Sequence, residues 1–179
     1  MRNEIVKTLK RLALGGALAA VATNGFAVTQ GTVGFTSTGD VDITLTVNDE
    51  VNITNLADIL LPAFAGADVS GTSPACIYRN GGATYQVTAT GSGPANAFQL
   101  INAGLTDTVN YSVTWDDGTG ALPMTSGLAV NRTNAVNVDN NCAGVGNNAQ
   151  IEVTVTAADA SVLPADSYLG TLYFLVAPI

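Results

Sequence analysis

The chain has 179 residues, of which only 11% are charged, and its formal net charge is −8. Typical soluble domains carry about 25% charged residues; here Thr, Asn, Ser and Gly take their place, which is typical of extracellular β-proteins and not of cytosolic enzymes. Histidine is absent, and with it the commonest general base and the commonest zinc ligand. We therefore expect a protein that is not an enzyme and that holds no metal and no cofactor.

Residues 1–27 have the pattern of a cleaved secretory signal peptide. Four basic residues lie among the first eleven positions, the apolar run 12–22 follows them, and small residues precede Val28. A membrane anchor is the alternative interpretation, but it needs about 20 apolar residues to span a bilayer. The sequence therefore predicts an exported protein.

Removal of this leader makes the remaining chain strongly acidic. Two cations, Arg79 and Arg132, then stand against thirteen carboxylates, which gives a net charge of −11. Such a surface repels phosphate backbones and anionic lipids. We expect no nucleic-acid partner and no membrane binding after cleavage.

Residues 31–47, GTVGFTSTGDVDITLTV, alternate strictly between an apolar and a polar face, the period of a β-strand. At about 3.3 Å per residue this strand would extend about 55 Å, whereas ordinary strands reach about 20 Å. The pattern predicts a strand too long for one small domain. Its large apolar members are Val33, Phe35, Val41, Ile43, Leu45 and Val47.

The rest of the chain carries short strand patterns separated by turn signals. Val51 and Ile53 continue the odd register, which breaks at Leu56, and the composition of 66–74 predicts a loop. Further strands are expected over 84–90, 97–102, 109–115, 150–157 and 167–176. About seven short strands and at most a turn or two of helix predict one all-β domain, a β-sandwich that is Ig-like in the broad sense.

The last of these strands is apolar on both faces. One face carries Tyr168, Gly170, Leu172, Phe174 and Val176, and the other is also largely apolar. We expect this strand to be covered on both sides or to contact another chain.

Two cysteines, Cys76 and Cys142, follow the leader. In an oxidising compartment an isolated pair is expected to form one disulfide. The closed loop of about 65 residues would stabilise the fold by about 4 kcal/mol in the chain-entropy model. A metal site or a catalytic thiol is the competing interpretation, and both are weak without histidine.

Residues 116–120, DDGTG, predict a turn after Trp115 in which Asp116 and Asp117 point apart. Trp115 lies between the cysteines in the order of antibody domains, where a tryptophan packs on the disulfide. Order alone is a weak signal, and we favour an ordinary core or half-exposed aromatic. The Asn-rich stretch 137–148 is only loosely similar to a calcium loop, and we expect turns there.

The leader, the alternating arm, the single cysteine pair and the ending YLGTLYFLVAP, residues 168–178, together resemble subunits of bacterial chaperone-usher pili. The arm motif VDITLTV and the ending SYLGTLYFLVAP look more like the archaic branch with spore coat protein U-like domains. In that branch a cysteine follows soon after the arm, whereas here that place reads VNDEVNIT and the first cysteine is Cys76.

This resemblance implies an Ig-like pilin body, residues 48–179, that lacks one strand and has a hydrophobic groove in its place. A periplasmic chaperone fills the groove first, and the N-terminal donor-strand arm of the next subunit, residues 28–47, then replaces it at an outer-membrane usher. Val41 to Val47 would form the core of the donor, extended by Val33 and Phe35. The resemblance implies that the apolar face from Tyr168 to Val176 belongs to the acceptor groove.

The implied product is a homopolymer of identical or related subunits, a cell-surface fimbrium that serves adhesion and biofilm formation. A shaft position is favoured over the tip, because no receptor-binding domain accompanies the body. A monomeric secreted binding module, such as a surface adhesin or matrix protein whose arm pairs within its own sheet, is the alternative. A secreted hydrolase is the weakest hypothesis, since the usual catalytic residue types are missing.

Overall fold

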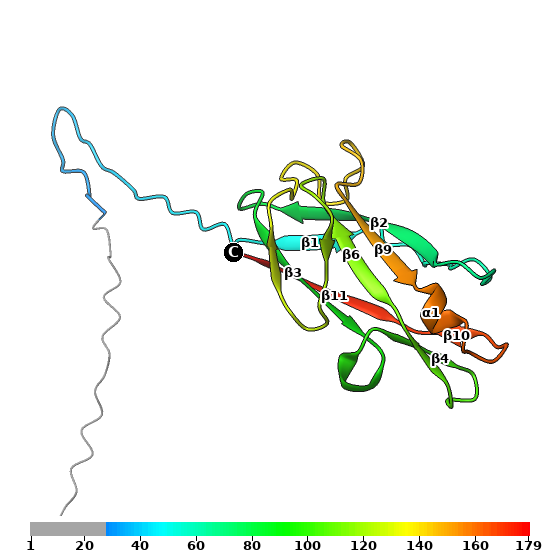
Figure 1. Cartoon of the computed structure of the whole chain (residues 1–179). Coiled ribbons are helices and arrows are strands. Elements are labelled where there is room, and N and C mark those ends of the chain that lie inside the picture. The colour runs from blue at the N-terminus through cyan, green and yellow to red at the C-terminus, as the bar shows by residue number, and fades with distance from the viewer. Residues whose placement is uncertain (1–27) are drawn as a thin grey trace, which may run out of the picture. The chain divides into compact units, whose positions relative to one another are not determined.

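The computed structural model describes residues 28–179, so the signal peptide predicted over 1–27 lies outside the described residues. By its internal contacts the chain divides into two units, with the boundary between Thr46 and Val47. The second unit, the body, contains every strand in the described residues (Figure 1). None of the described helices is long and apolar enough to cross a bilayer.

The body is built from three hydrogen-bonded sheets in which every strand pairing is antiparallel. The first sheet runs in the order β1 (Val51–Thr54), β2 (Val69–Arg79), β9 (Ala149–Val155), β6 (Ser112–Asp116) and β7 (Leu122–Pro123). The second contains β11 (Leu172–Pro178), β3 (Tyr85–Gly91) and β8 (Val130–Arg132), and the third β10 (Tyr168–Leu169), β4 (Gln99–Asn102) and β5 (Thr108–Asn110). The 3-10 turn η1 (Pro94–Asn96) and the short helix α1 (Ala157–Ala160) complete the elements.

This strand order is that of an immunoglobulin-type sandwich with one position unfilled. In such a sandwich strands A, B, E and D form one sheet and C, F and G the other. The order within the first sheet, β1, β2, β9 and β6, corresponds to A, B, E and D. In the second sheet β3 corresponds to C and β11 to F. In the described part of the chain no strand pairs with the outer side of β11, where G would lie. The predicted all-β, incomplete Ig-like sandwich is confirmed.

The core lies between the two main sheets, and the predicted alternation places it correctly. Tyr85, Val87 and Ala89 of β3 are fully buried and face the buried residues Ile151 and Val153 of β9. Polar residues occupy the intervening positions of both strands. A period of two therefore identified the inward face of each strand.

Trp115 is an ordinary core aromatic. Its side chain is fully buried, with its ring centroid 6.5 Å from that of Tyr85 and 5.5 Å from that of Phe174. Its indole N–H donates to the Tyr85 hydroxyl at 3.0 Å. Buried tryptophan N–H groups need such a partner, and here Tyr85 supplies it from the facing sheet.

The predicted loop over 66–74 is wrong, because β2 begins at Val69. Pro74 is tolerated because this half of β2 forms a ladder only with β9 and has no strand partner on its other edge. Position 71 needs glycine because the neighbouring segment packs closely against it: a Cβ there would lie 2.9 Å from the Ile59 side chain. The Gly and Pro content that suggests a loop thus reflects an edge and a close approach of the neighbouring segment.

Two expected strands are interrupted. The 109–115 segment divides into β5 and β6, which belong to different sheets, although Val109, Tyr111 and Val113 all stay buried. The final segment divides between β10 and β11 at Gly170, where a Cβ would lie 2.9 Å from the Leu100 side chain. Alternation predicts which side chains face inward, but it does not reveal a change of sheet.

The turn after Trp115 forms as predicted, but Asp117 is not a free turn carboxylate. It is fully buried and ion-paired with Arg132 of β8, and the Tyr85 hydroxyl donates to it at 3.1 Å. Burial alone would raise the pKa of the Asp117 carboxyl, but hydrogen bonds from Arg132 and Thr119 outweigh it and hold the pKa below its usual value. This buried pair joins the end of β6 to the facing sheet.

Candidate functional site: a groove beside the last strand and an unpaired arm

The free edge of β11 is the first feature of the candidate site. β11 pairs with β3 along its whole length, from Leu172 opposite Gly91 to Pro178 opposite Tyr85. On its other side β11 approaches β1 without forming a ladder. An unpaired strand edge presents a row of backbone donors and acceptors to any extended chain.

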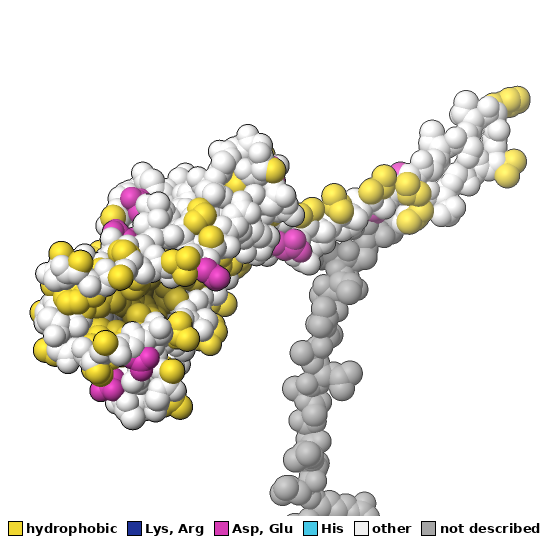
Figure 2. All heavy atoms as spheres, turned by 90° about the vertical axis from the view of Figure 1, so that its right-hand side faces the viewer, with side chains coloured by type: hydrophobic (Ala, Val, Ile, Leu, Met, Phe, Trp, Pro, Cys, Tyr) yellow, Lys and Arg dark blue, Asp and Glu magenta, His cyan; other side chains and the backbone are white. Residues whose placement is uncertain are grey.

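An apolar groove of about 1060 Å³ opens beside this edge. One wall is the segment 56–64, and the other is formed by β10 and the first half of β11. Figure 2, viewed from the end of the body that carries α1 and β10, shows hydrophobic side chains lining a hollow on this face. The floor consists of core residues from β5, β9 and the connection between β5 and β6: Val109, Tyr111, Ile151, Val153 and Val155.

The wall 56–64 is extended but is not a strand. Asn55, directly after the end of β1, has a positive φ of 63°, and the next apolar residue, Leu56, is exposed. Beyond it Ile59 and Leu61 turn toward the core, whereas Leu60 is 87% exposed. The Ala57 N–H donates to the Ser73 hydroxyl at 2.9 Å instead of joining a ladder. The groove therefore has unpaired backbone on both of its rims.

Four of the five acceptor residues expected from the sequence lie at this groove: Tyr168, Gly170, Leu172 and Phe174. Val176, the fifth, packs against the core but does not line the groove. The other face of the last strand is uncovered in the single chain, since Tyr173 and Leu175 are 54% and 67% exposed.

Sequence reasoning missed the wall formed by residues 56–64 and much of the floor. Ile59 and Leu61 belong to the apolar run LADILLP, whose broken phase was the only signal available. The floor residues were identified as core, and only the topology shows that they lie beneath an unfilled strand position.

The arm, residues 28–47, has no strand partner and forms no strand in this structure. Its six large apolar side chains from Val33 to Val47 are between 72% and 112% exposed. The chain bends over residues 33–36, and the Asp40 N–H donates to the Thr29 carbonyl at 3.2 Å. In this conformation Val33 and Phe35 lie on a bend and do not extend the line of residues 41–47. A strand needs a partner for its backbone hydrogen bonds, which the single chain does not give the arm.

Residues 48–50, the part of the body from which the arm extends and here called its root, are fastened beside the end of β11. Asn80 accepts the Glu50 N–H and donates to the Asn48 carbonyl, both at 2.7 Å. Arg79, itself 5% exposed, donates to Asp49 at 3.0 and 2.5 Å and to the Ile179 carbonyl at 2.7 Å. Because of the hydrogen bonds from Arg79, the pKa of the Asp49 carboxyl lies below its usual value.

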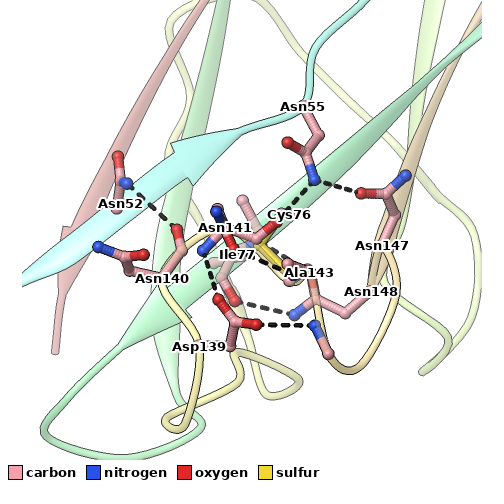
Figure 3. Close-up of a disulfide and its surroundings, with 12 residues drawn as sticks. Asn52, Asn55, Cys76, Ile77, Asp139, Asn140, Asn141, Ala143, Asn147 and Asn148 are labelled. Atoms are coloured by element: carbon pink, nitrogen blue, oxygen red, sulfur yellow. Dashed lines mark hydrogen bonds between the residues drawn. A yellow bond between two sulfur atoms is a disulfide. The ribbon is translucent and has the colours of Figure 1, made fainter.

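The disulfide forms between Cys76 and Cys142, whose Cα atoms are 5.8 Å apart. It ties the irregular loop 137–148 to β2 (Figure 3). The side-chain amide of Asn148 accepts the Ile77 N–H at 2.7 Å and donates to the Ile77 carbonyl at 2.9 Å. This pair of bonds imitates a strand partner for β2 and orders the loop beside the disulfide.

The polar side chains of the same loop bond within the loop and to the end of β1. The Asp139 carboxylate is used within the loop, where it accepts the N–H groups of Asn141 at 3.2 Å and Gly144 at 2.8 Å. Asn55, at the end of β1, donates to the Asn141 carbonyl and to Asn147, both at 2.8 Å (Figure 3). Within residues 28–179 no three acidic, His or Cys side chains gather as a metal site. The asparagines thus order the turns expected there.

Comparisons with known proteins address the fold. No family model matches the sequence, and no curated protein matches it. Among solved structures the fold is similar to a chain of a chaperone-tip adhesin complex described as vital for synergistic activation of CFA/I fimbriae biogenesis, with a TM-score of 0.53 and 15% identity. The match covers 74% of this chain and 42% of that chain, so this chain spans less than half of the matched one. The likeness shows that the body has the Ig-like fold of that structure.

Removal of the disulfide should destabilise the body strongly. The bond joins residues 66 apart in the sequence, so the double variant C76A/C142A should lose about 4 kcal/mol of unfolding free energy in the chain-entropy model. Urea denaturation of both proteins under non-oxidising, non-reducing conditions measures the difference. A loss below about 1 kcal/mol would show that the Asn-rich loop holds β2 without the covalent bond.

Acid should weaken the Asp49–Arg79 pair in a defined direction. The pKa of Asp49 is lower in the folded chain than its ordinary value of 3.8, so its stabilising effect is complete above about pH 4 to 5 and is lost as the pH falls through the folded value. The difference in unfolding free energy between wild type and D49N should shrink as the pH is lowered below 4. Equal pH profiles for the two proteins would contradict a contribution from this pair.

Proposed function

We propose that this chain is a structural subunit of an extracellular fimbria that polymerises by donor-strand complementation. The observation that carries the proposal is the apolar groove at the unfilled G position of the Ig-like body. The same chain also has an exposed arm whose apolar residues recur with the period of a strand. The arm of one copy would complete the sandwich of the next.

The physical basis is β-strand addition. Backbone hydrogen bonds to the free edge of β11 hold the arm, while alternate side chains enter the groove. Val41, Ile43, Leu45 and Val47 would each contribute about 1.5 to 3 kcal/mol on full burial, before the cost of ordering the arm. Thr44 and Thr46 lie between them and face away. Because an apolar strand with free edges promotes aggregation, the arm is suited to a bound state.

Chain direction favours a second copy as the source of the arm. Neighbouring F and G strands of an Ig-like sandwich are antiparallel. The chain's own arm continues into its root, residues 48–50 of the body, which are fastened beside the C-terminal end of β11. If it entered its own groove directly from this root, it would run parallel to β11. The arm of another copy has no such tether and can enter antiparallel.

A contact of one arm with one groove is heterologous, and its repetition produces a fibre. Identical or related subunits are therefore the proposed partners. Before assembly the groove would need a temporary occupant, for which we propose a periplasmic chaperone, and an outer-membrane usher for export. The disulfide fits passage through an oxidising compartment. Adhesion and biofilm formation at the cell surface are the roles proposed for the fibre.

Two matched arm variants test this function. I43D places a carboxylate on the face proposed to enter the groove, where burial of an unpaired charge is strongly unfavourable, whereas T44D adds the same charge on the opposite face. Purified wild-type protein, residues 28–179, should give a ladder of polymers on gels without boiling and one band after it. I43D should give only the monomer, and T44D should keep the ladder.

The outcome also decides between the fibre and a monomeric secreted module whose arm pairs within its own sheet. For the fibre, ladder formation should depend on protein concentration. If wild type and I43D stay monomeric at every concentration, or if both give the same ladder, the arm is not an intermolecular donor and the proposed function is rejected.

A further inference from the structure

Both arginines of the described chain are used internally. Arg79 and Arg132 are 5% and 8% exposed, and they are ion-paired with Asp49 and Asp117. No lysine and no other arginine occurs in residues 28–179. Every free charged side chain of this part of the chain is therefore a carboxylate, and Figure 2 shows acidic but no basic side chains on the groove face.

Two carboxylates lie at the groove, one on each wall. Asp58 on one wall and Asp166 on the other are among the residues that line it. Burial, and then the carboxylates of Asp107 and Asp166, raise the pKa of the Tyr168 hydroxyl, which lies on the same wall. The mouth is thus a region of negative potential with no cation to offset it.

The arm brings charges of the same sign. Asp40 and Asp42 alternate with Val41 and Ile43, so they point away from the groove when the apolar residues point into it. In that arrangement both carboxylates lie along the outer side of the inserted strand. Insertion then joins a negative arm to a negative rim, and apolar burial and backbone hydrogen bonds must overcome the repulsion.

We propose that ionic strength controls insertion of the arm of a second copy: repulsion between Asp40 and Asp42 of the arm and the acidic groove rim slows assembly in dilute salt, and screening accelerates it. This inference rests on the proposed function and adds its regulation. The Debye length falls from about 30 Å at 0.01 M salt to about 8 Å at 0.15 M. Repulsion that reaches across the groove mouth in the first condition is confined to near neighbours in the second.

The test measures the initial rate of polymerisation by light scattering for wild type, D42N and E152Q. Glu152 is an exposed carboxylate on β9, and its neighbours Ile151 and Val153 point to the groove side of the sheet. E152Q therefore removes the same charge from the opposite face. Between about 10 and 150 mM NaCl the wild-type rate should rise by about tenfold.

D42N should assemble severalfold faster than wild type at the lower salt concentration and respond less to added salt, whereas E152Q should follow the wild type. Comparison at equal salt separates screening from any strengthening of apolar burial, which affects all three proteins alike. A wild-type rate that is constant or falls with salt, or an E152Q profile equal to that of D42N, overturns the inference while polymers still form. Absence of polymers at every salt concentration rejects the proposed function and this inference with it.

Discussion

The unpaired outer edge of β11 is the constraint on which the rest of the structure depends. An Ig-like body without a G strand leaves backbone groups unpaired along β11 and leaves an open groove with Val153 and Tyr111 of the core at its bottom. Backbone groups need hydrogen-bond partners and an open apolar groove needs cover, and one extended, alternating segment supplies both. The arm has this alternation, and by itself it makes no strand. Groove and arm are therefore complementary in their chemistry.

The body remains ordered without that strand because other contacts join its two layers. Asp117 and Arg132 connect the sheets through a buried ion pair, Trp115 and Tyr85 connect them through a hydrogen bond, and the disulfide fastens the Asn-rich loop. Removal of one partner of a buried ion pair typically costs about 3 to 5 kcal/mol, because the other charge is left uncompensated. Arg132 is held in this buried pair and Arg79 in a pair with the partly exposed Asp49, so the charged side chains that remain for partners in residues 28–179 are all carboxylates.

Alternation predicted the inward faces of β3, β6 and β9 and the exposed apolar face of the arm, because each depends on local periodicity alone. The groove wall formed by β10 and β11 could be predicted from the final strand, where Leu172 and Phe174 repeat with a period of two. The wall formed by 56–64 could not, since the chain leaves the ladder at Asn55 and the apolar run around Ile59 and Leu61 also contains the exposed Leu60, which hides the inward pair. Likewise the burial of Asp117 depends on Arg132, a partner from another sheet that no local pattern identifies.

The central claim is that the arm of one copy fills the groove of another. The most direct measurement places a photoreactive amino acid at position 43, mixes equal amounts of chains with natural and heavy nitrogen, and maps the cross-links by mass spectrometry. The account predicts links from position 43 to groove residues near Leu172 or Val153, with mixed-isotope pairs about as frequent as same-isotope pairs, as a heterologous contact requires. Links found only within single chains, or none to the groove, would contradict it.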